Sequence, residues 1–289
     1  MVANDGRESL RGLLNKAGKS TDDAAVSDFK VIVARHLGTT CTAMLIDLMY
    51  GREALDELRG AAPDTGRIVA VDLFDEPRFG PLASTTLDHD AIEAAAQFDD
   101  VHALKFFSFW HPDQPKAKRV DESAEFVERC AQLGVLSLLE GVVQLPVTDP
   151  RFDDSLLAAG AEYGQAMPDL YKTQVPSIGT RPLEDVQSMS ADLSREVGTP
   201  WVALSNGIAA DNFADVVSAV CRGGASGFLA GRASWSPAIS ADDPETELET
   251  IGRTRLASYV ERVDRDAVPW WIAAGEPPQG AVTTGETGA

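Results

Sequence analysis

Eight apolar runs, most of them separated by stretches with helical periodicity, constrain the fold of this 289-residue chain most strongly. Amphipathic segments lie between them, such as 21–37, with Asp22 or Asp23 as N-cap, and 211–224, which ends on glycines. Nearly continuous apolar strands that alternate with helices indicate a parallel sheet covered on both faces. Eight such units predict an α/β fold of the (β/α)8 (TIM) barrel type. The runs span 1–5, 41–50, 68–74, 103–110, 135–143, 169–176, 200–208 and 227–235.

An open, doubly wound sheet is the competing fold, but no GxGxxG motif follows any of the eight runs. Residues 1–274 are therefore expected to form one barrel domain. Its final helix covers about 245–266, and Trp270 and Trp271 are expected to pack against the barrel wall or a partner subunit. Residues 275–289 are rich in Gly, Pro and Thr without apolar periodicity, which predicts a disordered tail.

The charge balance excludes several classes of partner. With 25 basic and 45 acidic side chains the net charge is −20, which disfavours nucleic acid and anionic membranes. No run of 18 apolar residues occurs and the N-terminus lacks a secretory signal, so a cytoplasmic protein without membrane contact is expected.

The sequence also lacks the common metal and nucleotide motifs. Cys41, Cys130 and Cys221 lie far apart without CxxC spacing, which favours buried thiols over disulfides or a thiolate metal site. The histidines show neither HxH nor HExxH spacing, and no Gx4GK[ST] motif occurs. We therefore expect neither a metal ion nor a cofactor.

Polar residues close the apolar runs, and in a (β/α)8 barrel the carboxyl ends of the strands carry the active site. Several of these residues lie roughly 30 positions apart, the length of one strand–helix unit. Because inward-pointing residues form layers drawn from alternate strands, the lysines and the arginine of strands four, six and eight are expected on shared layers. The closing residues are Asp5, Asp47, Asp72, Lys105, Glu140, Lys172, Ser205 and Arg232.

Lys105 and Lys172 stand in apolar runs, where a long cation is costly unless it has a partner or a function. Burial and a second nearby lysine weaken the preference for the ammonium form, and the neutral amine condenses with a ketone to an imine. Glu140 on the neighbouring strand could then move protons. The structural alternative is a buried ion pair of Lys105 with Glu140, with Lys172 paired to Asp5 or Asp47.

The ends of strands seven and eight resemble a phosphate site. Ser205, Asn206 and Gly207 close one strand, and a glycine-rich segment leads to Arg232 at the other. Barrels of this type often bind phosphate there, through backbone N–H groups and a bidentate arginine. The alternative is that these glycines only form turns and that Arg232 pairs with an acidic neighbour.

With these segments in view, the sequence resembles the class I ketose-phosphate aldolases, a family that includes tagatose-1,6-bisphosphate and sulfofructosephosphate aldolases, and it is more similar to the second. The resemblance runs from residue 1 to about 236. It is carried by "MVANDGRESLR", "VSDFKVIVARHL", "AMLIDLMYG", "ALKFFSFW", "LLEGVV", "DLYKTQVP" and "PWVALSNGIAADNFADVVSAVCRGGASGFLAGRASW".

The resemblance implies a metal-independent aldolase that cleaves a phosphorylated ketose to dihydroxyacetone phosphate and a three-carbon aldehyde. Lys172 would be the Schiff-base lysine, Glu140 the proton-transfer group, Lys105 the cation that orients them, and Asp5 the carboxylate after strand one. The implied substrate is a sugar phosphate or sulfosugar phosphate, and a homo-oligomer is among the expected states. The substrate-binding residues would be Ser205, Asn206, Gly207, Gly231 and Arg232, with Arg7 and Asp47 at the ends of the first two strands.

The chain departs from the family pattern at two positions. Gly6 stands where the family has a glutamine, and Gln174 stands where it has a glutamate. Two other functions stay open at this point: another imine-forming barrel enzyme, such as a transaldolase or dehydratase, and a non-catalytic barrel that binds sugar phosphates.

Overall fold

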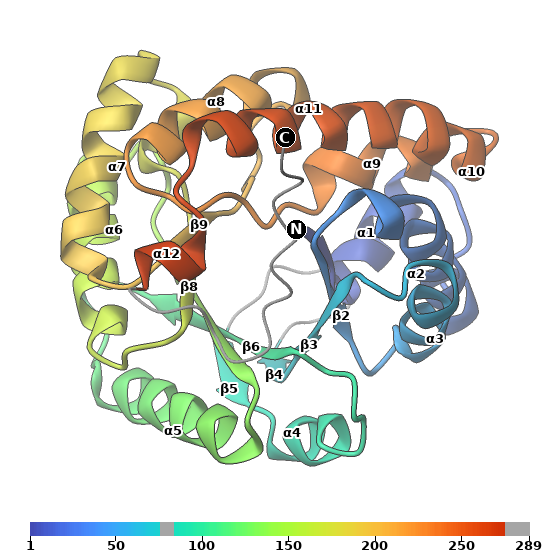
Figure 1. Cartoon of the computed structure of the whole chain (residues 1–289), viewed down its shortest axis with the longest axis horizontal. Helices are drawn as coiled ribbons and strands as arrows, with labels where there is room; N and C mark the ends of the chain where they lie inside the picture. The colour runs from blue at the N-terminus through green and yellow to red at the C-terminus, as the bar shows by residue number, and fades with distance from the viewer. Residues whose placement is uncertain (76–83, 275–289) are drawn as a thin grey trace, which may run out of the picture.

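A ring of parallel strands surrounded by helices forms the molecule (Figure 1). The computed structural model describes residues 1–75 and 84–274. Within these residues, seven strands form one parallel sheet in the order β1-β2-β3-β6-β7-β8-β9. They are β1 (Val2–Asn4), β2 (Ala43–Asp47), β3 (Gly66–Ala70), β6 (Ala103–Trp110), β7 (Leu136–Val143), β8 (Leu170–Thr173) and β9 (Trp201–Ala203).

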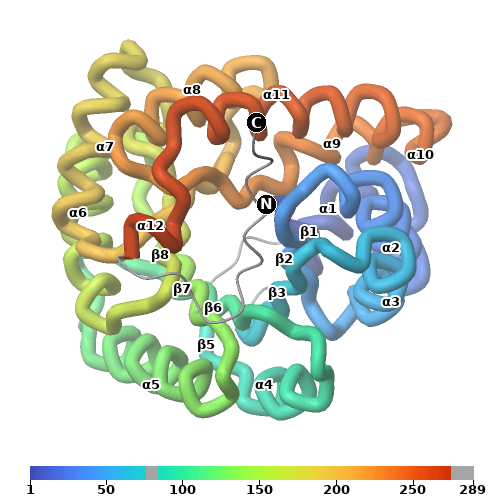
Figure 2. Tube along the Cα trace, in the orientation of Figure 1, coloured from blue at the N-terminus to red at the C-terminus, as the bar shows by residue number. Residues whose placement is uncertain are grey.

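Residues 228–230 close the ring. Parallel bridges join Ala203 to Phe228 and Val2 to Ala230, which places this segment between β9 and β1. The predicted (β/α)8 barrel is therefore confirmed, with its eighth strand reduced to two bridging residues. Figure 2 follows the chain once around the ring in this order.

The helices lie outside the strands, and their starts follow from the sequence. The side chain of Asp22 accepts the Ala25 N–H and caps α2, which confirms one of the two predicted caps. No helix in the described ranges is long and apolar enough to cross a membrane. The helices are α1 (Glu8–Lys16), α2 (Asp23–Leu37), α3 (Arg52–Ala61), α4 (His89–Ala95), α5 (Ala117–Leu133), α6 (Phe152–Gly164), α7 (Leu183–Val197), α8 (Ala210–Arg222), α9 (Arg232–Ser240), α10 (Pro244–Glu247), α11 (Arg253–Asp266) and α12 (Trp270–Ala273), with short turns η1 (Gly38–Thr40), η2 (Pro176–Gly179) and the π-turn η3 (Leu248–Gly252).

The third predicted strand, 68–74, is wrong in its second half. The sheet strand β3 ends at Ala70, and β4 (Asp72–Asp75) pairs antiparallel with β5 (Ser84–Leu87) in a separate hairpin. The chain leaves the barrel at Val71, whose N–H donates to the Lys105 carbonyl while its own carbonyl accepts the Asp88 N–H. Leu73 and Phe74 follow Asp72 and continue the apolar pattern, so periodicity alone does not indicate the turn.

The eighth predicted strand, 227–235, is also too long, because α9 begins at Arg232. Gly231 allows this turn, since a Cβ there would lie 2.6 Å from the carbonyl oxygen of Ala3 on β1. Arg232 is therefore the first residue of a helix rather than a member of a barrel layer, which corrects the layer assigned to it from the sequence.

Alternation along the strands divides the barrel interior into an apolar floor and a charged mouth. One buried cluster gathers side chains from β2, β3, β6, β7, β8, β9 and the closing segment 228–230, and Ala3 of β1 packs against it. Two residues further along a strand the inward position is charged: Lys105 follows Ala103, and Glu140 follows Leu138. The cluster consists of Leu45, Ile68, Ala70, Ala103, Leu138, Leu170, Val202 and Leu229.

The short helix α12 covers the floor. Trp270 packs against the interior cluster together with Met1, Ala43 and Leu136, which lie at the amino ends of their strands. This confirms the expected packing of Trp270 against the barrel. Trp271 points elsewhere, with 40% of its surface exposed. The predicted disordered tail, 275–289, lies outside the described residues.

Replacing Trp270 with alanine is expected to lower the free energy of unfolding by about 1–3 kcal/mol, because it opens the apolar floor to water. Trp271→Ala is the control, since Trp271 is not among the residues packed against the interior cluster and 40% of its surface is exposed, so a smaller loss is expected. Urea unfolding of both variants measures the difference. Equal losses in the two variants would show that Trp270 does not seal the floor.

Candidate active site

Lys172 and Glu140 lie side by side at the mouth of the barrel. They are direct partners in the register of β8 and β7, so both side chains leave the sheet on the same side. Lys172 Nζ lies 2.9 Å from Glu140 Oε1, and both residues are buried, with 4% and 5% of their surfaces exposed. At this distance a proton can pass between the amine and the carboxylate.

Lys105 on β6 lies at the centre of three carboxylates of the described chain. Its Nζ is 2.6 Å from Asp72, 2.8 Å from Asp5 and 3.5 Å from the second oxygen of Glu140. The Lys105 side chain is fully buried. Glu140 therefore bridges the two lysines, with one oxygen toward each.

Lys105 and Asp5 stabilise each other's charged forms within this cluster. Burial opposes the ammonium of Lys105, but the attraction of Asp5, Asp72 and Glu140 outweighs it and raises the pKa of Lys105 above its ordinary value. Burial likewise opposes ionisation of Asp5, but Lys105 and Lys172 outweigh it and lower the pKa of Asp5. Lys105 is therefore a permanent cation that keeps its neighbouring carboxylate ionised.

These contacts bring together the four residues predicted as catalytic, namely Asp5, Lys105, Glu140 and Lys172. The ion pair of Lys105 with Glu140, which the structural alternative expected, is present. Lys172 pairs with Glu140, so its expected pairing with Asp5 or Asp47 is wrong. The catalytic and the structural interpretations of these residues are compatible, because the same ion pairs place an amine against a proton acceptor.

Asp47 and Arg7, predicted as substrate-binding residues, are held by other protein groups. Asp47 is fully buried, pairs with Lys30 of α2 and accepts the N–H groups of Met49 and Tyr50. Arg7 donates to the carbonyl of Asp72 at 2.6 Å and faces the carboxylate of that residue at 3.3 Å. The structure thus places Arg7 beside the Asp72 and Lys105 cluster and Asp47 next to Arg7, and it engages the charges of both residues within the protein.

The predicted anion-binding residues lie after β9 and at the start of α9. Asn206 and Gly207 have φ values of 29° and 87°, which explains why this turn uses residue types that tolerate the left-handed region. Gly231 precedes the first turn of α9, whose leading N–H groups have no partner within the helix. In the described part of the chain, no carboxylate forms an ion pair with Arg232, so its expected pairing with an acidic neighbour is not seen.

Gln174, one of the two departures from the family pattern, has a structural role. Its side-chain oxygen accepts the Val143 N–H at 2.7 Å, and its amide nitrogen lies 3.4 Å from the Val143 carbonyl. A glutamate could not donate the second of these bonds. Gln174 therefore ties the end of β8 to the end of β7, next to the Glu140–Lys172 pair.

Asp72 is the site residue that the sequence-based assignment left out. The sequence places Asp72 among the polar residues that close the apolar runs, but it predicts no catalytic or binding role for Asp72. The available signal was the two-residue alternation, since Asp72 follows Ala70 of the interior cluster as Lys105 follows Ala103. The hairpin that begins at Asp72 also brings Phe74 over the guanidinium of Arg7, 4.8 Å from the ring centre.

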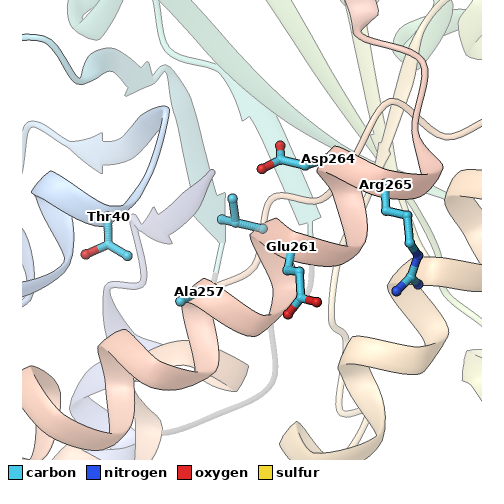
Figure 3. Close-up of a pocket in the computed structure, with 6 residues that line it drawn as sticks. Thr40, Ala257, Glu261, Asp264 and Arg265 are labelled. Carbon is cyan, nitrogen blue, oxygen red and sulfur yellow. The ribbon is translucent and has the colours of Figure 1, made fainter.

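Two other observations limit where ligands could bind. A hollow of about 550 Å³ lies between Thr40 and the side of α11 (Figure 3), where Glu261, Asp264 and Arg265 line it. Thr40 precedes β2, so this hollow lies toward the floor and includes none of the predicted site residues. Across residues 1–75 and 84–274, no group of three or more His, Cys, Asp or Glu side chains is arranged to hold a metal ion.

A barrel whose mouth holds a buried amine against a carboxylate has the groups that imine chemistry requires. Comparison with known proteins specifies the class further. Residues 6–237 match the profile of the DeoC/LacD family aldolases. The chain belongs to this family, and it is a lyase of the aldolase type.

Relatives and solved structures agree with this assignment. The tagatose 1,6-diphosphate aldolase of Listeria monocytogenes serotype 4a (strain HCC23) is 25% identical over 317 aligned positions, covering 95% of this chain and 90% of the relative. Tagatose 1,6-diphosphate aldolase 1 of Enterococcus faecalis (strain ATCC 700802 / V583) is 24% identical and covers 92% and 90%. The fold resembles fructose-bisphosphate aldolase from Plasmodium falciparum, with a TM-score of 0.69, 12% identity and coverage of 96% and 90%.

Proposed function

We propose that the protein is a class I aldolase that cleaves a phosphorylated ketose through an imine on Lys172. The observation that carries this proposal is the 2.9 Å contact between the buried Lys172 amine and Glu140 at the barrel mouth. Glu140 takes a proton from the Lys172 ammonium, and the neutral amine then attacks the C2 carbonyl of the ketose. The carbinolamine loses water to give a protonated imine, with Glu140 as the proton donor to the departing hydroxyl.

The bond between C3 and C4 then breaks. A carboxylate removes the proton of the C4 hydroxyl, a three-carbon aldehyde leaves, and the electron pair of the broken bond passes to the imine nitrogen to form an enamine. Protonation at C3 restores the imine, and water releases dihydroxyacetone phosphate and the free amine. In this proposal Asp5 and Glu140 carry out these transfers, since both lie within 3.5 Å of Lys105 Nζ, and Lys105 lowers the pKa of Asp5.

Arg232 and the first turn of α9 hold the phosphate next to the reacting ketone in this proposal. Two observations support this part of the proposal. Arg232 forms no ion pair with any described residue, and the first N–H groups of α9 have no partner within the helix. Ser205, Asn206 and Gly207 line the adjacent turn after β9 and supply further backbone donors.

Replacing Arg232 with alanine is expected to raise the KM for the ketose phosphate by about 10- to 100-fold, because a charged hydrogen-bond partner of the phosphate is lost. The inhibition constant of inorganic phosphate should rise by a similar factor. Arg232→Lys, which keeps the charge without the fork of donors, should recover part of the loss. An unchanged phosphate inhibition constant in Arg232→Ala would place the anion elsewhere.

The substrates that we propose are tagatose 1,6-bisphosphate, named for the relatives, and 6-deoxy-6-sulfofructose 1-phosphate. Both give dihydroxyacetone phosphate and a three-carbon aldehyde, so one coupled assay for dihydroxyacetone phosphate compares them directly. Turnover of either compound supports the proposal, and the ratio of the two kcat/KM values identifies the distal group. Tight binding of both without cleavage would contradict it and support a binding protein instead.

A further inference from the structure

Asp72 stands where the barrel strand β3 passes into the β4–β5 hairpin. The residue before it is anchored by two backbone hydrogen bonds, because the Val71 N–H donates to the Lys105 carbonyl at 2.9 Å and the Val71 carbonyl accepts the Asp88 N–H at 2.9 Å. Asp72 is fully buried. Its carboxylate therefore has a fixed position relative to the backbone of β6, the strand that carries Lys105.

The Asp72 carboxylate is itself fully occupied. One oxygen accepts both the Lys105 ammonium at 2.6 Å and the backbone N–H of Phe107 at 3.2 Å. The other oxygen faces the Arg7 guanidinium at 3.3 Å. A carboxylate that a backbone N–H holds on one side can set the direction of an ammonium on the other.

Of the three carboxylates around Lys105, Asp72 is the one that is fixed most firmly. Asp5 has 17% of its side chain exposed and lies on the open side of the cluster, and Glu140 lies 3.5 Å away and is shared with Lys172. Asp72 makes the shortest contact and has 1% of its side chain exposed. Asp72 is therefore the carboxylate best suited to fix the position of the Lys105 ammonium.

Asp72 also joins two groups of charges. On one side Arg7 continues to Asp47 and Lys30, and on the other side Lys105 continues to Asp5, Glu140 and Lys172. Within the described residues this network contains four cations and four carboxylates. Removing the Asp72 charge leaves a net positive charge in a buried cluster and frees the Lys105 ammonium to turn toward Glu140, which it would draw away from Lys172.

We propose that Asp72 is a positioning residue of the aldolase reaction, which fixes the Lys105 ammonium so that Glu140 stays in contact with the Lys172 amine. This inference rests on the proposed function. Asp72 does not touch the substrate in this arrangement. Its loss should therefore lower kcat and leave KM nearly unchanged.

The test compares Asp72→Asn, which keeps the shape of the side chain, with wild type and with Asp169→Asn. Asp169 is the matched control, because it also accepts a backbone N–H, from Ser137 at 2.8 Å, but stands at the amino end of β8. Active sites are counted by borohydride trapping with dihydroxyacetone phosphate, so that kcat refers to competent sites only. We expect kcat per site to fall about 10- to 100-fold in Asp72→Asn, with KM within about twofold, and Asp169→Asn to match wild type.

A second measurement does not depend on turnover. The chain has only seven lysines, so NMR of protein labelled with 15N-lysine can follow the buried Lys105 ammonium, assigned with Lys105→Met. Its resonance should be sharp and slow to exchange with solvent in wild type and should broaden or shift in Asp72→Asn. Asp72→Glu, which restores the charge, should recover part of kcat and serves as the second variant if Asp72→Asn does not fold.

The outcomes separate the two proposals. Absence of a trapped adduct or of turnover in wild type refutes the proposed function, and the Lys105 resonance then decides the role of Asp72. Wild-type kcat per site and an unchanged Lys105 resonance in a folded Asp72 variant refute the positioning role. A parallel fall in the number of competent sites and in stability, with kcat per site unchanged, makes Asp72 a structural residue only and equally refutes it.

Discussion

Replacing Lys172 with methionine is expected to abolish covalent trapping and to lower kcat by at least about 10⁴-fold. The reason is that Lys172 is the lysine paired with Glu140 in the register of β7 and β8, so the variant lacks the amine that forms the imine. Methionine has a similar length and no charge, so the barrel should remain folded. The measurement is borohydride reduction in the presence of dihydroxyacetone phosphate, followed by peptide mapping. Wild type should carry the adduct on the peptide that contains Lys172.

Lys16→Met is the control for this experiment, because Lys16 is an exposed lysine at the end of α1. It should retain both the adduct and the activity. An adduct on Lys105 in wild type would contradict the assigned roles, since the three carboxylates around Lys105 favour its ammonium form. Full activity of Lys172→Met would contradict imine catalysis at this position altogether.

Lys105→Met is expected to lower the free energy of unfolding by about 3–5 kcal/mol at neutral pH and to remove most activity. The substitution leaves Asp5, Asp72 and Glu140 close together and buried without the cation that they share. Each carboxylate then favours its neutral form, because burial and mutual repulsion raise its pKa. Urea unfolding at several pH values measures the effect.

The pH dependence of this variant should be opposite in sign to the contribution that Asp5 makes in wild type, where burial already raises the pKa of Asp72. In wild type the pKa of Asp5 is lowered, so its contribution to stability is present above its ordinary value and is lost as pH falls. In Lys105→Met the pKa values of the carboxylates are raised, so stability is lost as pH rises through them. The deficit should be larger at pH 8 than at pH 5. Lys118→Met, on an exposed helix surface, should show no deficit, and an equal deficit at both pH values in Lys105→Met would contradict buried, uncompensated carboxylates.

The barrel could be predicted because apolar runs recur at regular intervals along the sequence. Eight apolar runs at regular spacing identify a closed parallel sheet, and the sheet order confirms it. The ends of the runs were less predictable, since they depend on single contacts across the fold. The chain turns into α9 at Gly231, where the Ala3 carbonyl leaves no room for a Cβ, and it leaves the sheet at Val71, which bonds to Lys105 of β6 and to Asp88.

The candidate site could also be predicted only in part. Lys105, Glu140 and Lys172 could be predicted as neighbours, because they close adjacent strands of one sheet. The pairing of Arg7 with Asp72 and of Asp47 with Lys30 could not be predicted, because it depends on a hairpin and a helix whose placement no local pattern gives.

The covered floor of the barrel has a consequence for the order of events in the proposed reaction. Among the described residues, Trp270 and the apolar cluster close one end of the barrel, so we expect substrate, water and products to pass the rim at the carboxyl ends of the strands. The ketose fragment remains covalently bound to Lys172 after carbon–carbon cleavage, so the aldehyde is the product that can depart first. Water for hydrolysis then enters through the space that the aldehyde has left, and product release is expected to be strictly sequential.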